Sequence, residues 1–437
     1  MITNAVLISV VLLVILSLFR VNVLFAIIIA ALAAGIMSGM GVAETTAIMI
    51  EGMGGQSNTA LSYVLLGIFA VMIGMSGITG ILVDKMLVVF KGKKVALVLT
   101  IAGIACLSQN VIPVHIAFIP ILIPPLLVLF DQLRLDRRAV ASALTFGLKA
   151  PYLTIPAGFG LIFQGIIRDE MVANNMPISL NEVTVSMLIP GAGMLVGLFV
   201  AVFISYRKDR VPRESASFHM PGAEPDKRET GKWEFKHWMA VAAIAAALIV
   251  QLATESLVLG ALAGIFVLFL TRVVRMYDGD RVVQEGIGMM GTISFVMLVA
   301  SGYATVLKET GAVDDLVKQT TSFIGTSPLA IAFVILLVGL VITMGIGSSF
   351  GTIPILATLY VPICTAAGLS PLATAALIGT AGALGDAGSP ASDSTLGPTS
   401  GLNADGRHHH IWDTCVPTFL HYNIPLFIFG MIAALVL

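Results

Sequence analysis

Apolar residues run through this chain in long blocks, and the short segments between the blocks hold most of the charged residues. A block of roughly 20 apolar residues is what an α-helix needs to cross the hydrocarbon core of a bilayer. The pattern therefore predicts an all-α polytopic membrane protein with about ten transmembrane helices. These helices are expected at residues 4–19, 22–41, 60–82, 139–165, 185–206, 237–254, 256–271, 286–307, 371–400 and 412–437.

Polar residues, glycine and proline interrupt four apolar blocks. Residues 95–130 and 328–366 are too long for one crossing and break at SQNVIPVH and GIGSSFGTIP, so we expect two re-entrant hairpins. Residues 139–165 and 371–400 break at KAPYLTIPAGFG and GDAGSPASDST, and we expect two broken helices. Non-helical backbone survives at membrane depth only where it is buried in protein or lines a cavity.

Composition agrees with a membrane protein. Hydrophobic residues make up 57% of the chain and charged residues 11%, with a mean hydropathy of +0.98. The net charge of −1 indicates no particular partner, and basic residues cluster only in loops, so nucleic-acid binding is not expected. Cys106, Cys364 and Cys415 show no paired spacing, which argues against a disulfide framework or a zinc site. The first block lacks a basic leader and a small-residue cleavage site, so we expect a retained span.

The distribution of Lys and Arg predicts which side of the membrane each loop faces, because cytoplasmic loops are enriched in both. Segments 83–94, 131–138 and 206–236 are basic and are expected inside, the last with eight Lys or Arg. Segments 166–184 and 308–326 hold more acids than cations and are expected outside. With these assignments both chain termini are external.

The chain also contains an internal repeat with an offset of 234 residues, as between Pro120 and Pro354. The sequence Ile-Pro-Ile-Leu at 119–122 returns at 353–356, and Pro156-Ala157 returns as Pro390-Ala391. The loop charges place the two copies upside down relative to each other. Inverted repeats with interrupted helices are typical of secondary transporters, whose binding site lies where the copies meet. We therefore divide the chain into a first inverted repeat (1–206, with scaffold helices at 1–41), a cytoplasmic linker (207–236) and a second inverted repeat (237–437).

Polar residues at the four interruptions form the predicted binding site for ion and solute. Unwound carbonyls and Ser, Thr or Asn oxygens can replace water around Na⁺, and the N-terminus of a half-helix attracts a carboxylate. This hypothesis places Na⁺ at Asp393, Ser394 and Asn110. The full candidate set is Ser108, Gln109, Asn110, Thr154, Ser348, Ser349, Thr352, Asp386, Ser389, Ser392, Asp393, Ser394 and Thr395.

Asp386 and Asp393 are singled out because a charge inside a membrane span is costly and usually marks function. Each could bind a cation or a proton, or could instead cap a helix end in a water-accessible vestibule. Lys149 could neutralise Asp386 or carry charge when no cation is bound, or could lie nearer the cytoplasmic end of its helix. His115 could relay protons or be structural.

Two other motifs predict no site of their own. The sequence GMGG at 52–55 is not followed by Lys-Ser/Thr, so it is not a phosphate loop, and the charge pattern places it in an external loop. Without a nucleotide motif an ATP-driven pump is not expected, and without a nucleophile–base pair neither is an enzyme. His408, His409 and His410 are adjacent and cannot all face one metal ion on a helix. We expect a hydrated loop there, and an entry-side or pH-sensing role stays open.

The stretch from Ser389 to Phe419 resembles the signature of the sodium/proton antiporter family of the NhaC type. The resemblance is specific mainly over residues 385–425 and implies a homodimer in a bacterial-type cytoplasmic (inner) membrane, with a transport domain that slides against a scaffold in an elevator motion. A bacterial subgroup that the chain also resembles includes proteins thought to import amino acids, histidine among them. The residues that carry the resemblance are Ser389, Pro390, Ser392, Asp393, Ser394, Thr395, Thr399, Ser400, Asp405, His408, His410 and Thr414.

Two functions are compatible with these observations. The first is a cation/proton antiporter that uses Na⁺ or H⁺ as coupling ion and no cofactor. The second is a Na⁺- or H⁺-coupled importer of a small amino acid, such as histidine, or of an organic anion. The family signature favours the first. The amides of Gln109 and Asn110, together with Lys149, form a richer site than ion exchange alone requires and favour the second. Membrane lipid, a cation and a small solute are the expected partners.

Overall fold

A computed structural model gives the fold, and it describes residues 4–19, 21–78, 81, 92–110, 118–157, 159–210, 233–254, 256–312, 315 and 327–437. Over these residues every regular element is a helix, which confirms the predicted all-α class. Most of the predicted linker, residues 211–232, lies outside the described part of the chain.

The elements follow the interruptions in the apolar pattern. The helices are α1 (Ala5–Leu18), α2 (Val23–Met37), α3 (Val42–Met53), η1 (Gly54–Gln56), α4 (Ser57–Met75), α6 (Lys94–Asn110), α7 (Phe118–Gln132), α8 (Arg137–Thr154), α9 (Phe159–Ala173), α10 (Leu180–Phe199), η3 (Val200–Ser205), α11 (Phe235–Thr254), α12 (Leu257–Leu270), η4 (Met276–Asp278), α13 (Gly279–Glu309), α15 (Pro328–Ile346), α16 (Ser349–Ala366), α17 (Pro371–Ala383), α18 (Asp393–Leu402), η5 (His410–Cys415), α19 (Val416–Thr418), η6 (Phe419–Asn423) and α20 (Ile424–Val436).

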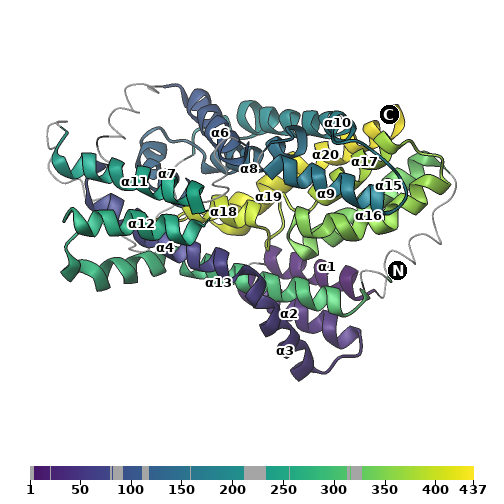
Figure 1. Ribbon diagram of the computed structural model, residues 1–437, viewed down its shortest axis with the longest axis horizontal. Coiled ribbons are helices and arrows are strands. Elements are labelled where there is room, and N and C mark those ends of the chain that lie inside the picture. Colours follow the sequence, from purple (N-terminus) through teal and green to yellow (C-terminus); the bar gives the residue numbers. More distant parts are fainter. Residues whose placement is uncertain are drawn as a thin grey trace.

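The molecule is elongated, with α4, α11 and α12 at one end and α15, α16 and α17 at the other (Figure 1). The short helices α18 and α19 lie near its middle, and α1, α2 and α3 project to one side (Figure 1). Buried residues of α11 and α12 pack with α4 in a separate apolar cluster, whereas α6 to α10 and α15 to α20 contribute to one large cluster.

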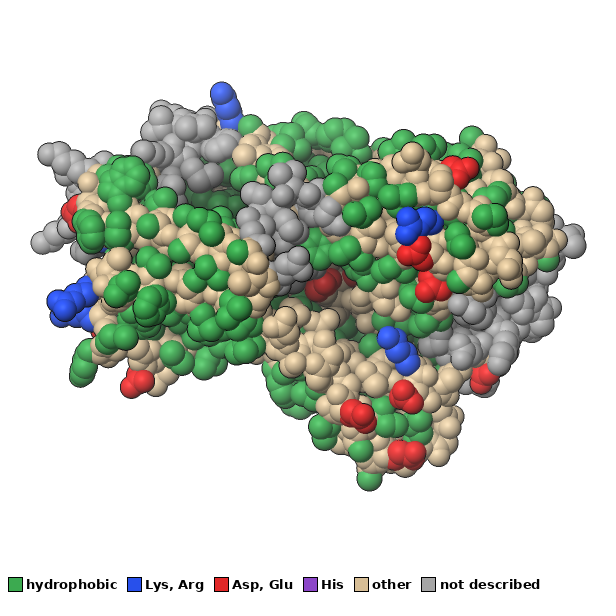
Figure 2. Space-filling model, in the orientation of Figure 1, with side chains coloured by type: hydrophobic (Ala, Val, Ile, Leu, Met, Phe, Trp, Pro, Cys, Tyr) green, Lys and Arg blue, Asp and Glu red, His purple; other side chains and the backbone are tan. Residues whose placement is uncertain are grey.

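Five described helical segments are long and apolar enough to cross a membrane, and the number rises to seven when each of two bent pairs counts as one span. The five are Val42–Met75, Leu180–Ser205, Met290–Glu309, Pro328–Ile346 and His410–Val436. Apolar side chains cover much of the visible surface, and charged side chains are sparse there (Figure 2). The predicted count of ten spans and two hairpins is finer than these lengths can test and stays a prediction.

The region from Val42 to Met75 differs from the sequence prediction. We expected GMGG at 52–55 in an external loop, but the helix continues through it, as α3, η1 and α4. The reason is packing. A side chain at Gly52 would collide with Thr305, and Ser301 of α13 donates a hydrogen bond of 2.8 Å to the Gly52 carbonyl. These glycines therefore allow α13 to approach closely and do not end the helix.

The interruptions themselves are visible in the helix axes. Helices α8 and α9 are bent by 48° across residues 155–158. Helices α15 and α16 meet at Gly347, whose φ of +70° ends α15 in the left-handed region that glycine tolerates. The Tyr360 hydroxyl donates to the Ile335 carbonyl at 3.0 Å, and these two residues lie about equally far from the break. Helices α15 and α16 therefore run antiparallel.

Two helix pairs are held at glycine contacts. Helix α6 packs on α8, where any side chain at Gly147 would collide with Ala105. Helix α15 packs on α17, where any side chain at Gly339 would collide with Ala381. In each pair a hydrogen takes the place of a methyl group at the crossing, which brings the helices close together.

Candidate functional site

The unwound segment between α17 and α18, residues 384–392, forms the centre of the candidate site. Gly385 adopts a φ of +81° and lies so close to Met344 and the Leu340 carbonyl that a side chain would not fit. The Asn423 side chain accepts from the Gly385 amide at 3.0 Å and donates to the Ala387 carbonyl at 2.7 Å. This replaces hydrogen bonds that the helix lost at the break, as buried backbone requires.

Asp386 is the buried charge in this segment, with 2% of its surface exposed. Its carboxylate forms an ion pair with Lys149 and accepts hydrogen bonds from the Ser349 and Ser392 hydroxyls. The Ser349 amide and the Ser394 hydroxyl also donate to it, at 3.3 Å and 3.2 Å. One carboxylate is thus surrounded by one ammonium group and several neutral donors.

Lys149 reaches this carboxylate from α8 and is 3% exposed. Its ammonium group also donates to the Ser349 hydroxyl at 3.2 Å and lies 5.3 Å from the centre of the Tyr152 ring. The Tyr152 hydroxyl is 2.9 Å from the Ser349 hydroxyl, and Phe163 and Phe350 pack on the Tyr152 ring. Three parts of the chain, α8, the start of α16 and the 384–394 segment, therefore meet at one buried ion pair.

Two helix N-termini point at this pair. Ser349 is the first residue of α16, and Ser392 caps the N-terminus of α18. The amides at a helix N-terminus carry partial positive charge, so both helices stabilise a negative charge on Asp386. This geometry is suited to holding the Asp386 carboxylate in its ionised form.

Asp393 lies at the start of α18, is partly exposed, and interacts electrostatically with Lys149 and Tyr63. The Tyr63 hydroxyl is buried without a hydrogen-bond partner in the described part of the chain. Behind Asp393, the Ser394 carbonyl accepts from Thr145 of α8 at 3.1 Å. Asp386 and Asp393 therefore occupy different environments. Asp386 is enclosed by protein, whereas Asp393 is partly exposed.

Several predicted site residues have other contacts. The Ser389 hydroxyl donates to the Met344 carbonyl, and the Thr395 hydroxyl donates to the Ser389 carbonyl. Both hydrogen bonds fix the shape of the unwound segment. The hydroxyls of Ser108, Thr154 and Thr352 donate to carbonyls of their own helices, and that of Ser348 accepts from the Gly351 amide. The side chains of Gln109 and Asn110, and the whole of His115, lie outside the described residues.

The sequence analysis missed Tyr152 and Asn423. Tyr152 follows Lys149 by three residues and so shares its helix face. Asn423 gave no signal, because its two partners lie more than 30 residues away along the chain.

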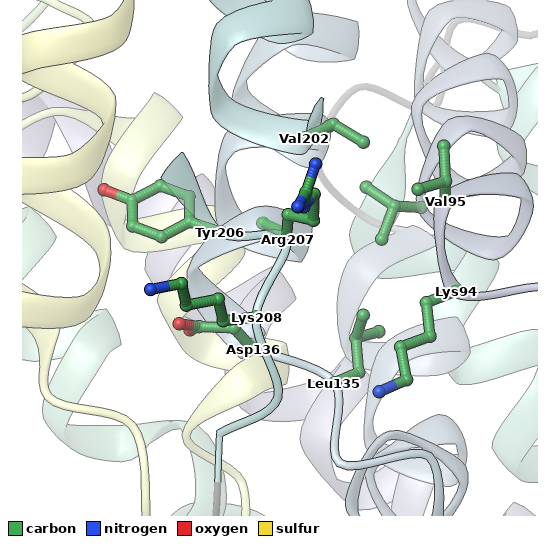
Figure 3. A pocket seen from close by; sticks show the side chains of 10 residues that line it. Lys94, Val95, Leu135, Asp136, Val202, Tyr206, Arg207 and Lys208 are labelled. Atoms are coloured by element: carbon green, nitrogen blue, oxygen red, sulfur yellow. The ribbon is translucent and has the colours of Figure 1, made fainter. Parts of the chain in front are cut away.

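A second charged region lies at the end of α8 opposite to Thr154. Arg137 donates through both terminal nitrogens to the Asp405 carboxylate, at 2.8 Å and 2.7 Å, and to Asp131 at 2.8 Å. Arg210 bridges Asp136 and Asp413, at 3.2 Å and 3.0 Å. A nearby pocket between α6, α8 and the end of η3 contains none of the predicted site residues (Figure 3). Its lining includes Lys94, Asp136, Tyr206, Arg207 and Lys208.

Apolar helices over the described residues, with a buried ion pair at a broken helix, are features of a membrane transporter. The comparisons define it further. The model of the Na⁺/H⁺ antiporter family matches residues 143–431, and a second model, described as Na⁺-H⁺ antiporter family, matches residues 4–90. The chain belongs to the Na⁺/H⁺ antiporter family, and it is a secondary transporter. This confirms the family predicted from residues 385–425.

Relatives extend over the whole chain. A Bacillus subtilis protein named "Putative amino acid transporter YuiF" is 49% identical over 452 residues, which cover 99% of this chain and 100% of that protein. An uncharacterised membrane protein of Vibrio parahaemolyticus is also 49% identical, over 99% of this chain and 100% of its own length. Among solved structures, the chain is similar to Neisseria gonorrhoeae MtrF, with a TM-score of 0.45 and 15% identity over 91% of this chain and 85% of that one. The family is one of transporters, and the Bacillus subtilis relative carries a transporter's name, which is consistent with a protein that is not an enzyme.

Proposed function

We propose that the protein exchanges cations for protons across a bacterial cytoplasmic membrane, with Lys149 and Asp386 as the exchange site. The observation that carries this proposal is the buried ion pair between them. Removing one partner of a buried pair leaves an uncompensated charge, which costs about 3–5 kcal/mol. Lys149 can therefore leave Asp386 only when another cation takes its place. A cation that arrives as Lys149 gives up its proton keeps the total charge of the site constant.

The groups around Asp386 suit such a replacement. When the ammonium group withdraws, the carboxylate and the hydroxyls of Ser349, Ser392 and Ser394 remain as oxygen ligands. Oxygen ligands of this kind replace the hydration shell of Na⁺ in membrane transporters. A proton on Asp386 would satisfy the same position. A second candidate position for the cation consists of Asp393 and Ser394, together with Asn110 as predicted from the sequence. It is less enclosed than the position at Asp386.

The proposed movement is alternating access by an elevator motion of a homodimer, with both termini external. Inverted repeats would provide the two equivalent states. The glycine contacts support such a duplication, because Ala105 and Gly147 are separated from Gly339 and Ala381 by the repeat offset of 234 residues seen between Pro120 and Pro354. The same crossing occurs in both halves, with glycine and alanine exchanged. In each state the site would open to one side only.

Import of a small amino acid or organic anion is the second candidate function. It is favoured by the name of the 49% identical Bacillus subtilis relative, which describes an amino acid transporter. In this version the ion at Asp386 drives uptake, and the N-terminus of α16 or α18 receives the carboxylate of the solute.

Purified protein in proteoliposomes tests both. A pH-sensitive dye inside the vesicles reports proton exchange under a Na⁺ gradient, and labelled amino acids and dicarboxylates report solute uptake. The proposal predicts a dye signal that needs Na⁺ and no added solute. Accumulation of a solute without exchange in its absence would instead establish the importer, and no response in either assay would contradict both.

A further inference from the structure

Two histidines and two threonines between α18 and η5 form a continuous chain of hydrogen bonds. The His408 Nε2 atom lies 2.7 Å from the Thr414 hydroxyl, and Thr414 lies 2.9 Å from the Thr399 hydroxyl. Thr399 lies 2.8 Å from Nδ1 of His410, whose Nε2 lies 2.9 Å from the Pro390 carbonyl. Every link has hydrogen-bond length, and every side chain in it can both receive and release a proton.

The chain joins two places of different character. His408 follows the loop 403–407, where Asn403 and Gly406 are exposed, and its amide donates to the Asn403 side chain at 3.1 Å. The other end is Pro390, in the unwound segment and two residues before Ser392, whose hydroxyl donates to Asp386. The links between them are enclosed, since Thr399, His408 and Thr414 are all buried.

Each hydroxyl in the chain carries one hydrogen. In the structure Thr399 donates to Thr414, and rotation of both hydroxyls would give the opposite order. When Thr414 points toward Thr399 and Thr399 toward His410, His408 donates from Nε2 and His410 accepts at Nδ1. When both hydroxyls turn round, as in the contact where Thr399 donates to Thr414, Nδ1 of His410 must donate instead. His410 keeps its Nε2 proton on the Pro390 carbonyl in both arrangements, so the second one makes it an imidazolium.

We propose that His408, Thr414, Thr399 and His410 form a proton relay between the 403–409 loop and the unwound segment that holds Asp386. The inference rests on the proposed proton exchange and adds the route by which the proton reaches the segment from one side of the membrane.

The transfer conserves protons at each step. A proton from water binds Nδ1 of His408, and the Nε2 proton of His408 passes to the Thr414 oxygen. The Thr414 proton passes to the Thr399 oxygen, and the Thr399 proton passes to Nδ1 of His410. His408 ends neutral with its proton on Nδ1, and His410 ends as an imidazolium whose Nε2 proton still bonds to Pro390. The cycle closes when His410 gives up its Nε2 proton to water at the unwound segment, each ring moves its remaining proton from Nδ1 to Nε2 through water, and both hydroxyls rotate back.

The charged groups around His408 disfavour a lasting positive charge on its ring, so a proton passes through this residue and is not held there. Arg137 of α8, Arg210 after η3, and His410 repel a positive charge on His408, whereas Asp413 of η5 attracts it. His410 faces His409, and the Cys415 sulfur lies 3.5 Å from its Nε2. Burial lowers the pKa of His408 to about 3, so this ring rests neutral and does not retain an added proton.

Thr414→Val is the informative variant, because it has the shape of threonine without the hydroxyl. Thr414→Ser restores a hydroxyl, and Thr418→Val removes a neighbouring hydroxyl that donates to the Thr414 carbonyl at 2.8 Å and is not in the chain. Proteoliposomes allow two fluxes to be compared: Na⁺-driven proton movement, reported by the dye, and exchange of labelled for unlabelled Na⁺ at equal pH, which moves no net proton.

We expect Thr414→Val to slow the proton flux by about tenfold or more, as loss of a positioned proton carrier does. The Na⁺ exchange should stay within about twofold of wild type, and Thr414→Ser and Thr418→Val should keep both fluxes. An unchanged proton flux in Thr414→Val, or an equal fall of both fluxes, would overturn the relay and leave the exchange site untouched. A wild-type protein with Na⁺ exchange but no proton flux would overturn the proposed function, and the relay with it.

Discussion

Two cation–carboxylate pairs among the described residues are buried on both sides, and they differ in how firmly the cation is held. Arg137 binds Asp405 through two parallel hydrogen bonds and Asp131 through another, so its guanidinium group is fixed on several sides. Lys149 presents one ammonium group to Asp386 and shares that carboxylate with Ser349 and Ser392. An arginine in such a fork keeps its proton, whereas a buried lysine can lose it. The first pair is therefore held more firmly, and the second is the one we propose to exchange.

The position of each pair agrees with this difference. Arg137 ties the start of α8 to the loop after α18, and Arg407 adds a further contact to Asp131 at 3.1 Å. Lys149 lies farther along α8, where the helix faces the unwound segment. Helix α8 therefore carries a multiply bonded arginine at one end and the proposed exchange site nearer the other.

Asp386→Asn should reduce cation–proton exchange more than any other substitution described below. The amide cannot balance Lys149 and cannot bind a cation as a carboxylate does, so exchange should fall by about 100-fold or more. Proteoliposome flux measures it. The double variant Asp386→Asn with Lys149→Gln removes both charges and separates loss of function from misfolding. If exchange survived in Asp386→Asn and disappeared in Asp393→Asn, the ion would bind at Asp393 and not at Asp386.

Lys149→Arg should keep the fold and lose most of the exchange. The positive charge remains beside Asp386, but the guanidinium group holds its proton at any physiological pH, so we expect a fall of about tenfold or more in flux. Lys94→Arg, at an exposed pair with Asp209, is the matched control and should behave as wild type. Full exchange in Lys149→Arg would show that this residue need not release a proton.

Arg137→Lys should show the opposite behaviour. Lysine cannot reproduce the fork on Asp405 and Asp131, and we expect a loss of about 2 kcal/mol in stability. Thermal unfolding in detergent measures this loss. The flux per folded molecule should stay near wild type. A variant of unchanged Tm with impaired exchange would mean that the fixed pair also takes part in transport.

Asn423→Ala should have the smallest effect of the four. It removes the two hydrogen bonds that hold the backbone at Gly385 and Ala387, which amounts to about 1–2 kcal/mol. The rate of hydrogen exchange should rise selectively at the amides of residues 384–392. Without Asn423 this segment opens more often, while the rest of the fold stays closed. Hydrogen exchange at residues 384–392 that is as slow in the variant as in the wild type would show that other contacts hold the break.

The local features of the site were readable from the sequence. Pro390 and the serines in GDAGSPASDST predicted a break inside an apolar block, and the cost of a buried charge drew attention to Asp386 and Lys149. The sequence also suggested that these two residues meet. Local rules were sufficient here because each feature depends on a few neighbouring residues.

The long-range features could not be read in the same way. Ser349 was a candidate for its place in a hairpin tip, but its bond to Asp386 depends on how α16 packs against α17. The fork between Arg137 and Asp405 joins residues 268 positions apart. GMGG was placed in an external loop from the charge pattern, which cannot show that this segment is helical and packs closely against α13.

The two glycine crossings impose a rule on how this sequence can vary. Where α6 meets α8 and where α15 meets α17, one helix carries a methyl group and the other only a hydrogen. The pairs are Ala105 with Gly147 and Ala381 with Gly339. A methyl group added at Gly147 or Gly339 would collide with its partner, so at each crossing the size of one residue limits the size of the other.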